Sequence, residues 1–587
     1  MDFFSAARST TTFFSSTFIL SLLSAAVLYA AYRIIYNLHF HPLAKHSGPL
    51  LGRITQWYDV YHAYIGDKHT NFHLLHERYG TVVRFSPNSL SINDPAALKA
   101  IYSHGANVQK SDFYVGFRAA PGAISTLLAT EKAHHARKRR IMGQAFSDQA
   151  MRGLETYVLE NIREWLGKLE AGVEVARARG TKWSNEIDMG KWNNYLVFDI
   201  MGDLVFGKSF GTLGQQPENR HAIHILGRAA RRNYTVTAMP YLWRSGIEKY
   251  LPLLRGLWLD RQAYFAFAKQ QVMQVMARNK SHPEKGDRKD IFSFLLTAKD
   301  PESGEGLPVP ELFMEGNTLI VAGSDTSSTT LSAILYYLVR NPSCLQRLTS
   351  EIRSTFSHEE EIRTGPKMQS CTYLRACIDE AMRMSPAVAG LLPRVVLPGG
   401  LQIPALDLDI PAGVDVGVCT YAIQHHKDYV VDPFTYNPDR FLTPATTTTA
   451  AKDATPAVAS HLRERSDSGI SLRNRTPSPS SKALKPSSHL TTPTTPALQD
   501  RDLLHQVFVP FSLGHRACLG KPLVYMELSI AIARMAWSYD VRHADKAAAG
   551  RDARVVESEY QTKDWFLGDN EGPVCEFAGR EGGGRGW

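Results

Sequence analysis

An uncharged run near the amino terminus constrains this chain more than any other feature of its sequence. The run, "FFSSTFILSLLSAAVLYAAY" from Phe13 to Tyr32, is long enough to cross a bilayer of roughly 30 Å as a helix. Arg8 precedes it, whereas Arg33 and Lys45 follow it. This asymmetry predicts that the carboxyl-terminal side faces the cytosol. The sequence has no second stretch as long and as apolar, so residues 37–587 are predicted to form one globular body.

A cleaved secretory signal is the alternative interpretation of this run. Signal peptides combine a basic region, an apolar core of roughly 7–15 residues and a small-residue cleavage site. Here the basic region is short, the apolar core is longer, and no clear A-x-A site follows. An uncleaved membrane anchor at residues 1–36 is therefore the favoured prediction.

Charge and cysteine content exclude two broad classes of protein. The 587 residues carry a formal charge of +9, but no sustained run of Lys or Arg occurs. This argues against nucleic-acid binding and fits an anionic membrane face or an acidic protein partner. The six cysteines include no C-x-x-C pair, which argues against a disulfide scaffold. We expect reduced thiols, most of them buried.

The pattern beyond the anchor is mainly helical, with a small β-rich part. Apolar residues three and four apart predict helices within Asp148–Arg278, from Pro310 to Arg340, and from Thr372 to Met384. Alternating residues around a Pro-Asn turn predict a hairpin at Thr81–Asp94. The stretch "LPGGLQIPALDLDIPAG" indicates short strands and turns.

A low-complexity segment interrupts the chain at about residues 443–499. Ser, Thr, Pro and Ala dominate it, and few large apolar side chains are present to offset the entropy of ordering it. The segment is predicted to be a disordered insertion, and its Ser-Pro and Thr-Pro pairs are hypothetical phosphorylation sites.

One cysteine lies in a glycine-rich loop, "FVPFSLGHRACLG", close to the carboxyl terminus. Four residues complete the pattern F-x-x-G-x-R-x-C-x-G around Cys518: Phe511, Gly514, Arg516 and Gly520. A structural thiol in a turn would explain the cysteine but not the five identities together. Glycines allow backbone N–H groups to point at a thiolate, and the following helical pattern would place a positive helix end near the sulfur. The pattern resembles the haem-binding loop of the cytochrome P-450 superfamily.

This resemblance implies a fold, a cofactor and an activity. The fold is mainly α with a small β-rich part, the cytochrome P-450 fold, preceded by a single N-terminal transmembrane helix. The cofactor is haem b, with Cys518 as the axial iron ligand and Arg516 beside a propionate. The activity is that of a haem-thiolate monooxygenase, which inserts one oxygen atom from O2 into a lipophilic small molecule. NADPH would supply the electrons through NADPH–cytochrome P-450 reductase.

A second motif lies in the middle of the helix predicted from Pro310 to Arg340. The stretch "AGSDTSSTT" is poor in helix-forming residues, although its flanks are apolar. A Ser/Thr-rich helix kink is the alternative. The stretch resembles the oxygen-binding groove A-G-x-D-T-[ST] of the family. By that resemblance Gly323 opens space for dioxygen, Thr326 supplies protons to it, and Asp325 connects Thr326 to solvent.

Three further residues resemble the buried structural triad of the family. Glu380 and Arg383 are three apart on one helical face, and such pairs are common on surfaces. The stretch "FTYNPDRF" resembles the later P-x-R-F element, whose arginine is here Arg440. The family pattern implies that Arg440 closes a buried cluster with the other two.

Basic residues elsewhere are implied to hold the haem propionates. The stretch "HHARKRRIMGQAFS" resembles the W-x-x-x-R helix, with His135 in place of tryptophan and Arg139 four residues later. Whether His134 or His135 meets the propionate stays open. Arg394, in "LLPR", matches another propionate-binding position. For each of these, a solvated surface side chain is the alternative.

The resemblance extends from about Tyr36 to Asp545 and is strongest to the fungal microsomal branch. It implies an endoplasmic reticulum protein with its catalytic domain in the cytosol, in secondary or xenobiotic metabolism. Four basic residues are expected to form a reductase-docking face: Lys138, Arg140, His515 and Lys521. Two alternatives remain: a haem-thiolate isomerase or dehydratase that needs no external electrons, and a non-catalytic membrane-tethered protein.

Substrate-pocket walls in this family come from variable segments. The corresponding segments here are Gly105–Thr126, parts of Thr181–Leu251, and Ala387–Leu392. Their largely apolar residues predict a lipophilic substrate but do not distinguish among terpenoids, polyketides, alkaloids and aromatic acids.

Overall fold

The computed structural model describes residues 3–118, 122, 124–214, 216–281, 290–442, 501–544 and 558–580. Its helices are α1 Phe3–Ile35, α2 Leu50–Ile54, α3 Trp57–Ile65, α4 Lys68–Tyr79, α5 Pro95–Tyr102, α6 Lys132–Gln144, α7 Asp148–Ala178, α8 Met189–Phe206, α9 Arg220–Thr237, α10 Pro240–Arg244, α11 Pro252–Ser281, α12 Ile291–Thr297, α13 Val309–Arg340, α14 Pro342–Thr355, α15 Pro366–Ser370, α16 Thr372–Met384, α17 Thr420–Gln424, α18 Arg501–Val507 and α19 Lys521–Ser538. Its strands are β1 Val82–Ser86, β2 Ser89–Ile92, β3 Val108–Lys110, β4 Ile187–Asp188, β5 Arg394–Val396, β6 Leu401–Ile403, β7 Leu408–Ile410, β8 Asp415–Gly417, β9 Tyr539–His543, β10 Thr562–Trp565, β11 Leu567–Asn570 and β12 Val574–Gly579. The predicted disordered insertion at about 443–499 lies outside the described residues.

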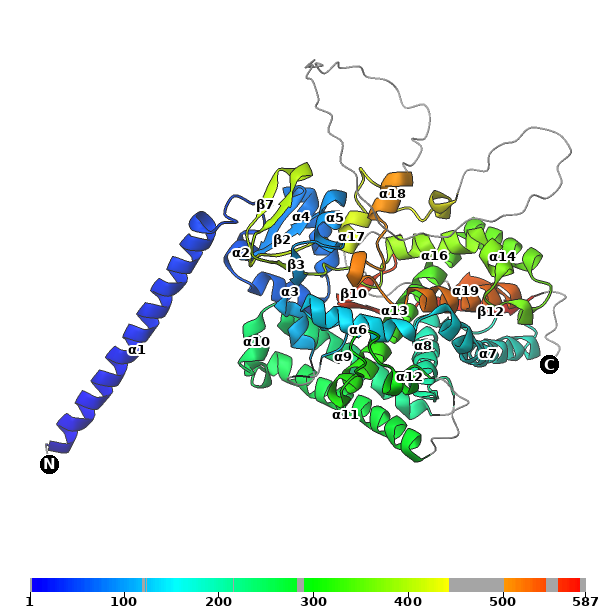
Figure 1. Cartoon of the computed structure of the whole chain (residues 1–587), viewed down its shortest axis with the longest axis horizontal. Coiled ribbons are helices and arrows are strands. Elements are labelled where there is room, and N and C mark those ends of the chain that lie inside the picture. Colours follow the sequence, from blue (N-terminus) through cyan, green and yellow to red (C-terminus); the bar gives the residue numbers. More distant parts are fainter. Residues whose placement is uncertain are drawn as a thin grey trace, which may run out of the picture. The chain divides into compact units, whose positions relative to one another are not determined.

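Helices dominate the fold, and the strands gather into small sheets (Figure 1). The largest sheet has the order β1-β2-β8-β5-β3, and the others pair β4-β12-β9, β6-β7 and β10-β11. The hairpin predicted at residues 81–94 is confirmed as β1 and β2, with Val83 opposite Ser91. The Pro- and Gly-rich stretch forms the predicted short strands β6 and β7. The pattern therefore predicted the fold class correctly.

Helix α1 contains the predicted membrane segment. In the part of the chain that the structure describes, it is the one helix long and apolar enough to cross a membrane, with a candidate span at Phe18–Phe40. The span extends beyond the end of the predicted run, because the π-helical turn Tyr36–Phe40 continues the apolar stretch past Arg33. The large apolar side chains of α1 from Phe18 onward are exposed, as expected of a helix that meets lipid.

Helix α13 runs through the helical core. It begins after Pro308 and ends before the Asn341-Pro342 pair, so the predicted boundaries are correct to one residue. Leu331, Ile334 and Leu335 on this helix are fully buried against neighbouring helices. The polar stretch of this helix is not a solvated face. The hydroxyl groups of Ser324 and Thr330 are buried and donate hydrogen bonds to backbone carbonyls of the preceding turn.

Glu380 lies at the centre of a buried ion cluster that joins α16 to the turn at Pro438–Phe441. Its two carboxylate oxygens accept hydrogen bonds from Arg383 at 2.8 and 2.9 Å, and from Arg440 at 3.2 Å. The backbone N–H of Asn437 donates a further bond of 3.0 Å. Glu380 and Arg383 have no exposed surface. The three residues that the sequence motifs singled out are thus brought together in the interior.

We expect Glu380→Ala to destabilise the protein by about 3–5 kcal/mol, because it leaves two buried guanidinium groups without their shared counter-charge. Denaturant unfolding would measure the change. The matched control is Lys191→Ala, which breaks the exposed pair of Lys191 with Asp188 at 2.9 Å and should change stability by less than about 1 kcal/mol. Haem content per polypeptide should fall with Glu380→Ala. Normal stability and full haem loading of this variant would contradict the role of the cluster.

Candidate haem-thiolate site

The Cys518 loop is a tight turn that ends at the first residue of α19. The backbone N–H of Cys518 donates to the carbonyl of Phe511 at 2.9 Å and closes the turn. Gly514 has a left-handed φ of 64°, and a Cβ there would collide with the carbonyl oxygen of Tyr102. A side chain at this position would therefore force the loop away from α5. The glycine of the motif has a steric reason that does not depend on any ligand.

Cys518 differs from the other cysteines in its surroundings. Among the described cysteines it alone has an exposed side chain, while four are buried and Cys344 is intermediate. Its side chain is exposed, but the protein atoms around the loop partly desolvate the sulfur, and this burial raises the pKa of the thiol. Backbone N–H groups of Gly520 and Lys521 and the charge of Arg139 oppose that increase. These donors would stabilise a thiolate once a cation is bound to it.

Positive side chains converge beside this loop. Arg516 donates to the carbonyl of Thr130 at 3.0 Å, Arg139 to that of Ala517 at 2.7 Å, and Arg394 to the hydroxyl of Tyr114 at 3.2 Å. Among the described residues, no carboxylate forms an ion pair with any of these arginines. They come from the loop itself, from α6 and from β5, which are far apart in the sequence.

Lys110 is a member of this cluster that the sequence analysis missed. It is buried at the end of β3 and donates to the carbonyl of Leu127. Burial, and then the charges of Arg394 and Arg516, hold its pKa well below the usual value of lysine. Nothing in its sequence neighbourhood marked it, because its proximity to the loop depends on the pairing of β3 with β5.

His135 and His134 have different environments. His135 is 3% exposed, and its pKa is lowered to about 2 by burial and by Arg516 and Lys110. It is therefore neutral and can donate one N–H. His134 instead directs Nε2 toward the carboxylate of Glu311, at 3.2 Å. Of the two histidines, His135 is the one that lies among the cations beside the Cys518 loop.

These residues fit a haem group. Lys110 and Arg394 are buried, and Arg139 and Arg516 are half-buried. Such a group of cations without a carboxylate is unfavourable unless an anion joins it, because desolvation disfavours an isolated charge. Haem carries two propionates, and its iron accepts a thiolate ligand. The cluster and the open sulfur of Cys518 thus match two separate requirements of the same cofactor.

The polar stretch of α13 presents a third part of the site. The hydroxyl of Thr326 donates to the carbonyl of Ala322 at 2.6 Å, which leaves its lone pairs free to accept. A Cβ on Gly323 would meet the end of the Met201 side chain, so α13 packs closely on α8 at this position. Asp325 is partly exposed. Ala322, which precedes this group, lines a large cavity.

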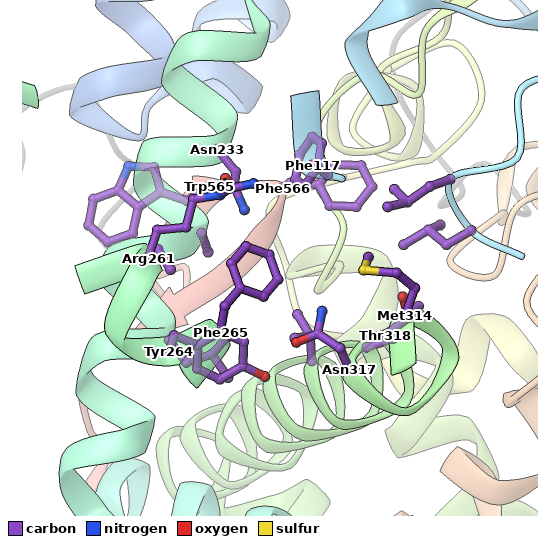
Figure 2. A pocket seen from close by; sticks show the side chains of 17 residues that line it. Phe117, Asn233, Arg261, Tyr264, Phe265, Met314, Asn317, Thr318, Trp565 and Phe566 are labelled. Atoms are coloured by element: carbon purple, nitrogen blue, oxygen red, sulfur yellow. Dashed lines mark hydrogen bonds between the residues drawn. The ribbon is translucent and has the colours of Figure 1, made fainter. Parts of the chain in front are cut away.

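This cavity lies between α9, α11, α13 and the turn that joins β10 to β11 (Figure 2). About 660 Å³ of space between atoms lies in this cavity and in the solvent at its mouth. Phe117 and the residues contributed by α9 fall within segments that the sequence analysis assigned to the pocket, whereas no described residue of Ala387–Leu392 lines it. That segment instead supports β11, because the carbonyl of Ala387 accepts a bond from Gly568.

Several lining residues lie outside the assigned segments, among them residues of α11, of α13 and of the β10–β11 hairpin. Arg261, Tyr264 and Phe265 come from α11, just beyond the assigned segment. Trp565 and Phe566 come from the β10–β11 hairpin, which lies beyond the residues covered by the resemblance. The hairpin gave no strong signal, since its polar and apolar residues do not alternate cleanly.

The prediction that Lys138 belongs to the docking face is wrong. The side chain of Lys138 has no exposed surface, because it pairs with Glu311 at 2.6 Å and with Glu315 at 3.1 Å. Glu315 also accepts two bonds of 2.7 Å from Thr126. A helical pattern in a basic stretch could not reveal that this lysine points inward. Arg140 is compensated by Asp300 at 2.8 Å.

We expect Gly514→Ala to weaken the loop by more than about 1–2 kcal/mol, the cost of a left-handed conformation for a residue with a Cβ, because the collision with Tyr102 adds to it. Gly143→Ala in α6 is the control, since a Cβ there meets no atom within 4 Å. Thermal unfolding and haem content would be measured for both. Equal behaviour of the two variants would contradict the steric argument.

Comparison with known proteins places the chain in one family. The cytochrome P-450 family model matches residues 45–455 and 497–549. Cytochrome P-450 monooxygenase apf7 of Gibberella fujikuroi is 34% identical over 94% of this chain and 97% of its own length. Cytochrome P-450 monooxygenase atnE of Emericella nidulans is also 34% identical, over 95% of this chain and 96% of its own. Cytochrome P-450 monooxygenase AKT7 of Alternaria alternata is 33% identical over 95% of this chain and 97% of its own length. The chain therefore belongs to the cytochrome P-450 family and is an oxidoreductase of the monooxygenase type.

Proposed function

We propose that this monooxygenase inserts one oxygen atom from O2 into a lipophilic small molecule of fungal secondary metabolism. The observation that carries the proposal is the open sulfur of Cys518 beside buried cations that lack carboxylates. The names and sources of the similar enzymes support a fungal oxidative role. The apolar lining of the cavity supports a lipophilic substrate.

Haem b would be held from two sides in this proposal. Cys518 would ligate the iron as a thiolate, assisted by the N–H groups of Gly520 and Lys521. Four other basic side chains would bind the propionates together with Arg516: Lys110, His135, Arg139 and Arg394. Bound haem supplies the redox chemistry that activates dioxygen. Phe511 would pack beside the sulfur and shield it from water.

The polar stretch of α13 would transfer protons from solvent to the haem side. Rotation of the Thr326 hydroxyl away from the carbonyl of Ala322 would let it donate toward the haem side. Asp325, which is partly exposed, would exchange protons with solvent. Gly323 faces Met201 of α8, so its part in this proposal is to let α13 pack closely on α8. An isomerase or dehydratase has no need of such a relay, so the Asp325-Thr326 pair favours the monooxygenase.

Membrane and partner contacts complete the proposal. Residues 1–36 would anchor the protein in the endoplasmic reticulum membrane with residues 37–587 in the cytosol, and NADPH–cytochrome P-450 reductase would deliver electrons. Lys521 is exposed and His515 partly exposed near the Cys518 loop, so they remain in the proposed docking face after Lys138 is removed from it.

Cys518→Ser tests the central ligand. The reduced wild-type protein with carbon monoxide should give the red-shifted Soret band of a thiolate-ligated haem, and the variant should lose this band together with substrate oxidation. Cys344→Ser, which changes a cysteine outside the loop, should retain both. A variant at Cys518 that kept the band would overturn the proposal.

Lys110→Met tests the propionate cluster. Removing an uncompensated buried charge should leave the apoprotein as stable as before or more stable. Loss of haem to a scavenger protein should become about tenfold faster or more, because one charge-assisted hydrogen bond is missing. Lys99→Met, at an exposed position of α5, is the control and should change neither rate nor stability. An unchanged rate of haem loss would remove Lys110 from the proposed site.

A further inference from the structure

The cavity beside α13 contains one charged side chain, Arg261. It is 8% exposed, and it projects from α11 toward Asn233 of α9 (Figure 2). The other described residues that line the cavity are apolar or uncharged. An arginine in an otherwise neutral, largely apolar chamber needs a specific reason, because a buried guanidinium without a counter-charge is unfavourable.

The protein itself does not supply that counter-charge. Nε of Arg261 donates to the Asn233 side chain at 3.1 Å, and one Nη donates to the carbonyl of Arg118 at 2.7 Å. The other Nη has no hydrogen-bond partner among the described residues. Glu248, the acid whose charge acts on Arg261, is already engaged through both oxygens by Arg232.

Burial and the charge of Arg232 lower the pKa of Arg261 to about 9. An anion bound beside Arg261 would relieve this effect. Other buried arginines of the described chain show how such groups are normally satisfied. Arg383 and Arg440 share Glu380, and all three donor positions of Arg84 bond backbone carbonyls. Arg261 has neither arrangement.

Two polar atoms near Arg261 also lack a partner. Tyr264 lies three residues further along α11, on the same helical face, and is 3% exposed. Asn317 of α13 faces it across the cavity and is 7% exposed (Figure 2). The Tyr264 hydroxyl and Asn317 Oδ1 have no hydrogen-bond partner among the described residues. Buried polar atoms are normally paired, so these two are suited to a ligand that carries polar groups.

We propose that the Arg261 end of the cavity binds a carboxylate, so that the substrate is an acid with a lipophilic body. The carboxylate would accept from the free Nη of Arg261, and its apolar remainder would extend along Val321 and Ala322 of α13. Arg261 is thus a residue that determines substrate specificity. This inference rests on the proposed function, because it assumes that the cavity holds the substrate.

Dodecanoic acid and methyl dodecanoate are suitable probes, since they differ only in the charge and hydrogen bonding of one end. Calorimetric titration of the full-length holoprotein at neutral pH would measure both dissociation constants. The acid should bind at least about tenfold more tightly than the ester, as expected of a charge-assisted hydrogen bond in a desolvated site. Equal affinities would overturn the inference.

Arg261→Gln should reduce the acid-to-ester preference to about one while leaving the affinity for the ester unchanged. Arg261→Lys retains the charge and should keep part of the preference. The control is Arg228→Gln on α9, because Arg228 already pairs with Asp260 at 2.5 Å and does not line the cavity. Equal losses for acid and ester in Arg261→Gln would mean that the arginine only shapes the cavity, and would overturn the inference.

The spectrum of the same preparations with carbon monoxide separates the two proposals. A thiolate-type band with no preference for the acid removes the substrate inference and leaves the monooxygenase proposal in place. A clear acid preference without that band retains the binding site and removes the proposed chemistry. If Arg261→Gln does not fold, the comparison of acid with ester in the wild-type protein still tests whether the cavity prefers a carboxylate.

Discussion

The arrangement of positive charge beside the Cys518 loop is the constraint on which the site depends. Arg516, Arg394 and Lys110 approach one another without a carboxylate among the described residues, although like charges in a desolvated region repel. The fold tolerates this only because backbone carbonyls and the Tyr114 hydroxyl accept their hydrogen bonds. In the proposed site, the propionates of haem would balance this charge.

The surrounding helices make that geometry rigid. Helix α13 packs so closely against α8 that Gly323 has no room for a side chain beside Met201. Helix α16 is fixed to the turn at Pro438–Phe441 through Glu380, and α19 starts directly after the cysteine loop. Backbone positions on both sides of the site are thus set by interactions that do not involve haem, which allows the fold to form a preorganised cradle.

Motifs with fixed local spacing were predictable, whereas tertiary proximity was not. The boundaries of α13 and α16, the β1–β2 hairpin and the grouping of Glu380 with Arg383 follow from helical and strand periodicity and from proline positions. Lys110 and Arg261 were missed because their surroundings are built by distant segments. The surface position predicted for Lys138 is wrong for the same reason. The sequence of this basic stretch does not show which side chains point inward, because that depends on the packing of α6 on α13.

The buried lysine of α6 also fixes this helix to α13. Lys138 bridges Glu311 and Glu315, and Glu315 in turn holds the backbone and hydroxyl of Thr126. Separating α6 from α13 would leave the buried members of these ion pairs without their partners, which costs more than moving apolar side chains past one another. These ion pairs therefore hold α6 against α13 more firmly than apolar contacts alone would.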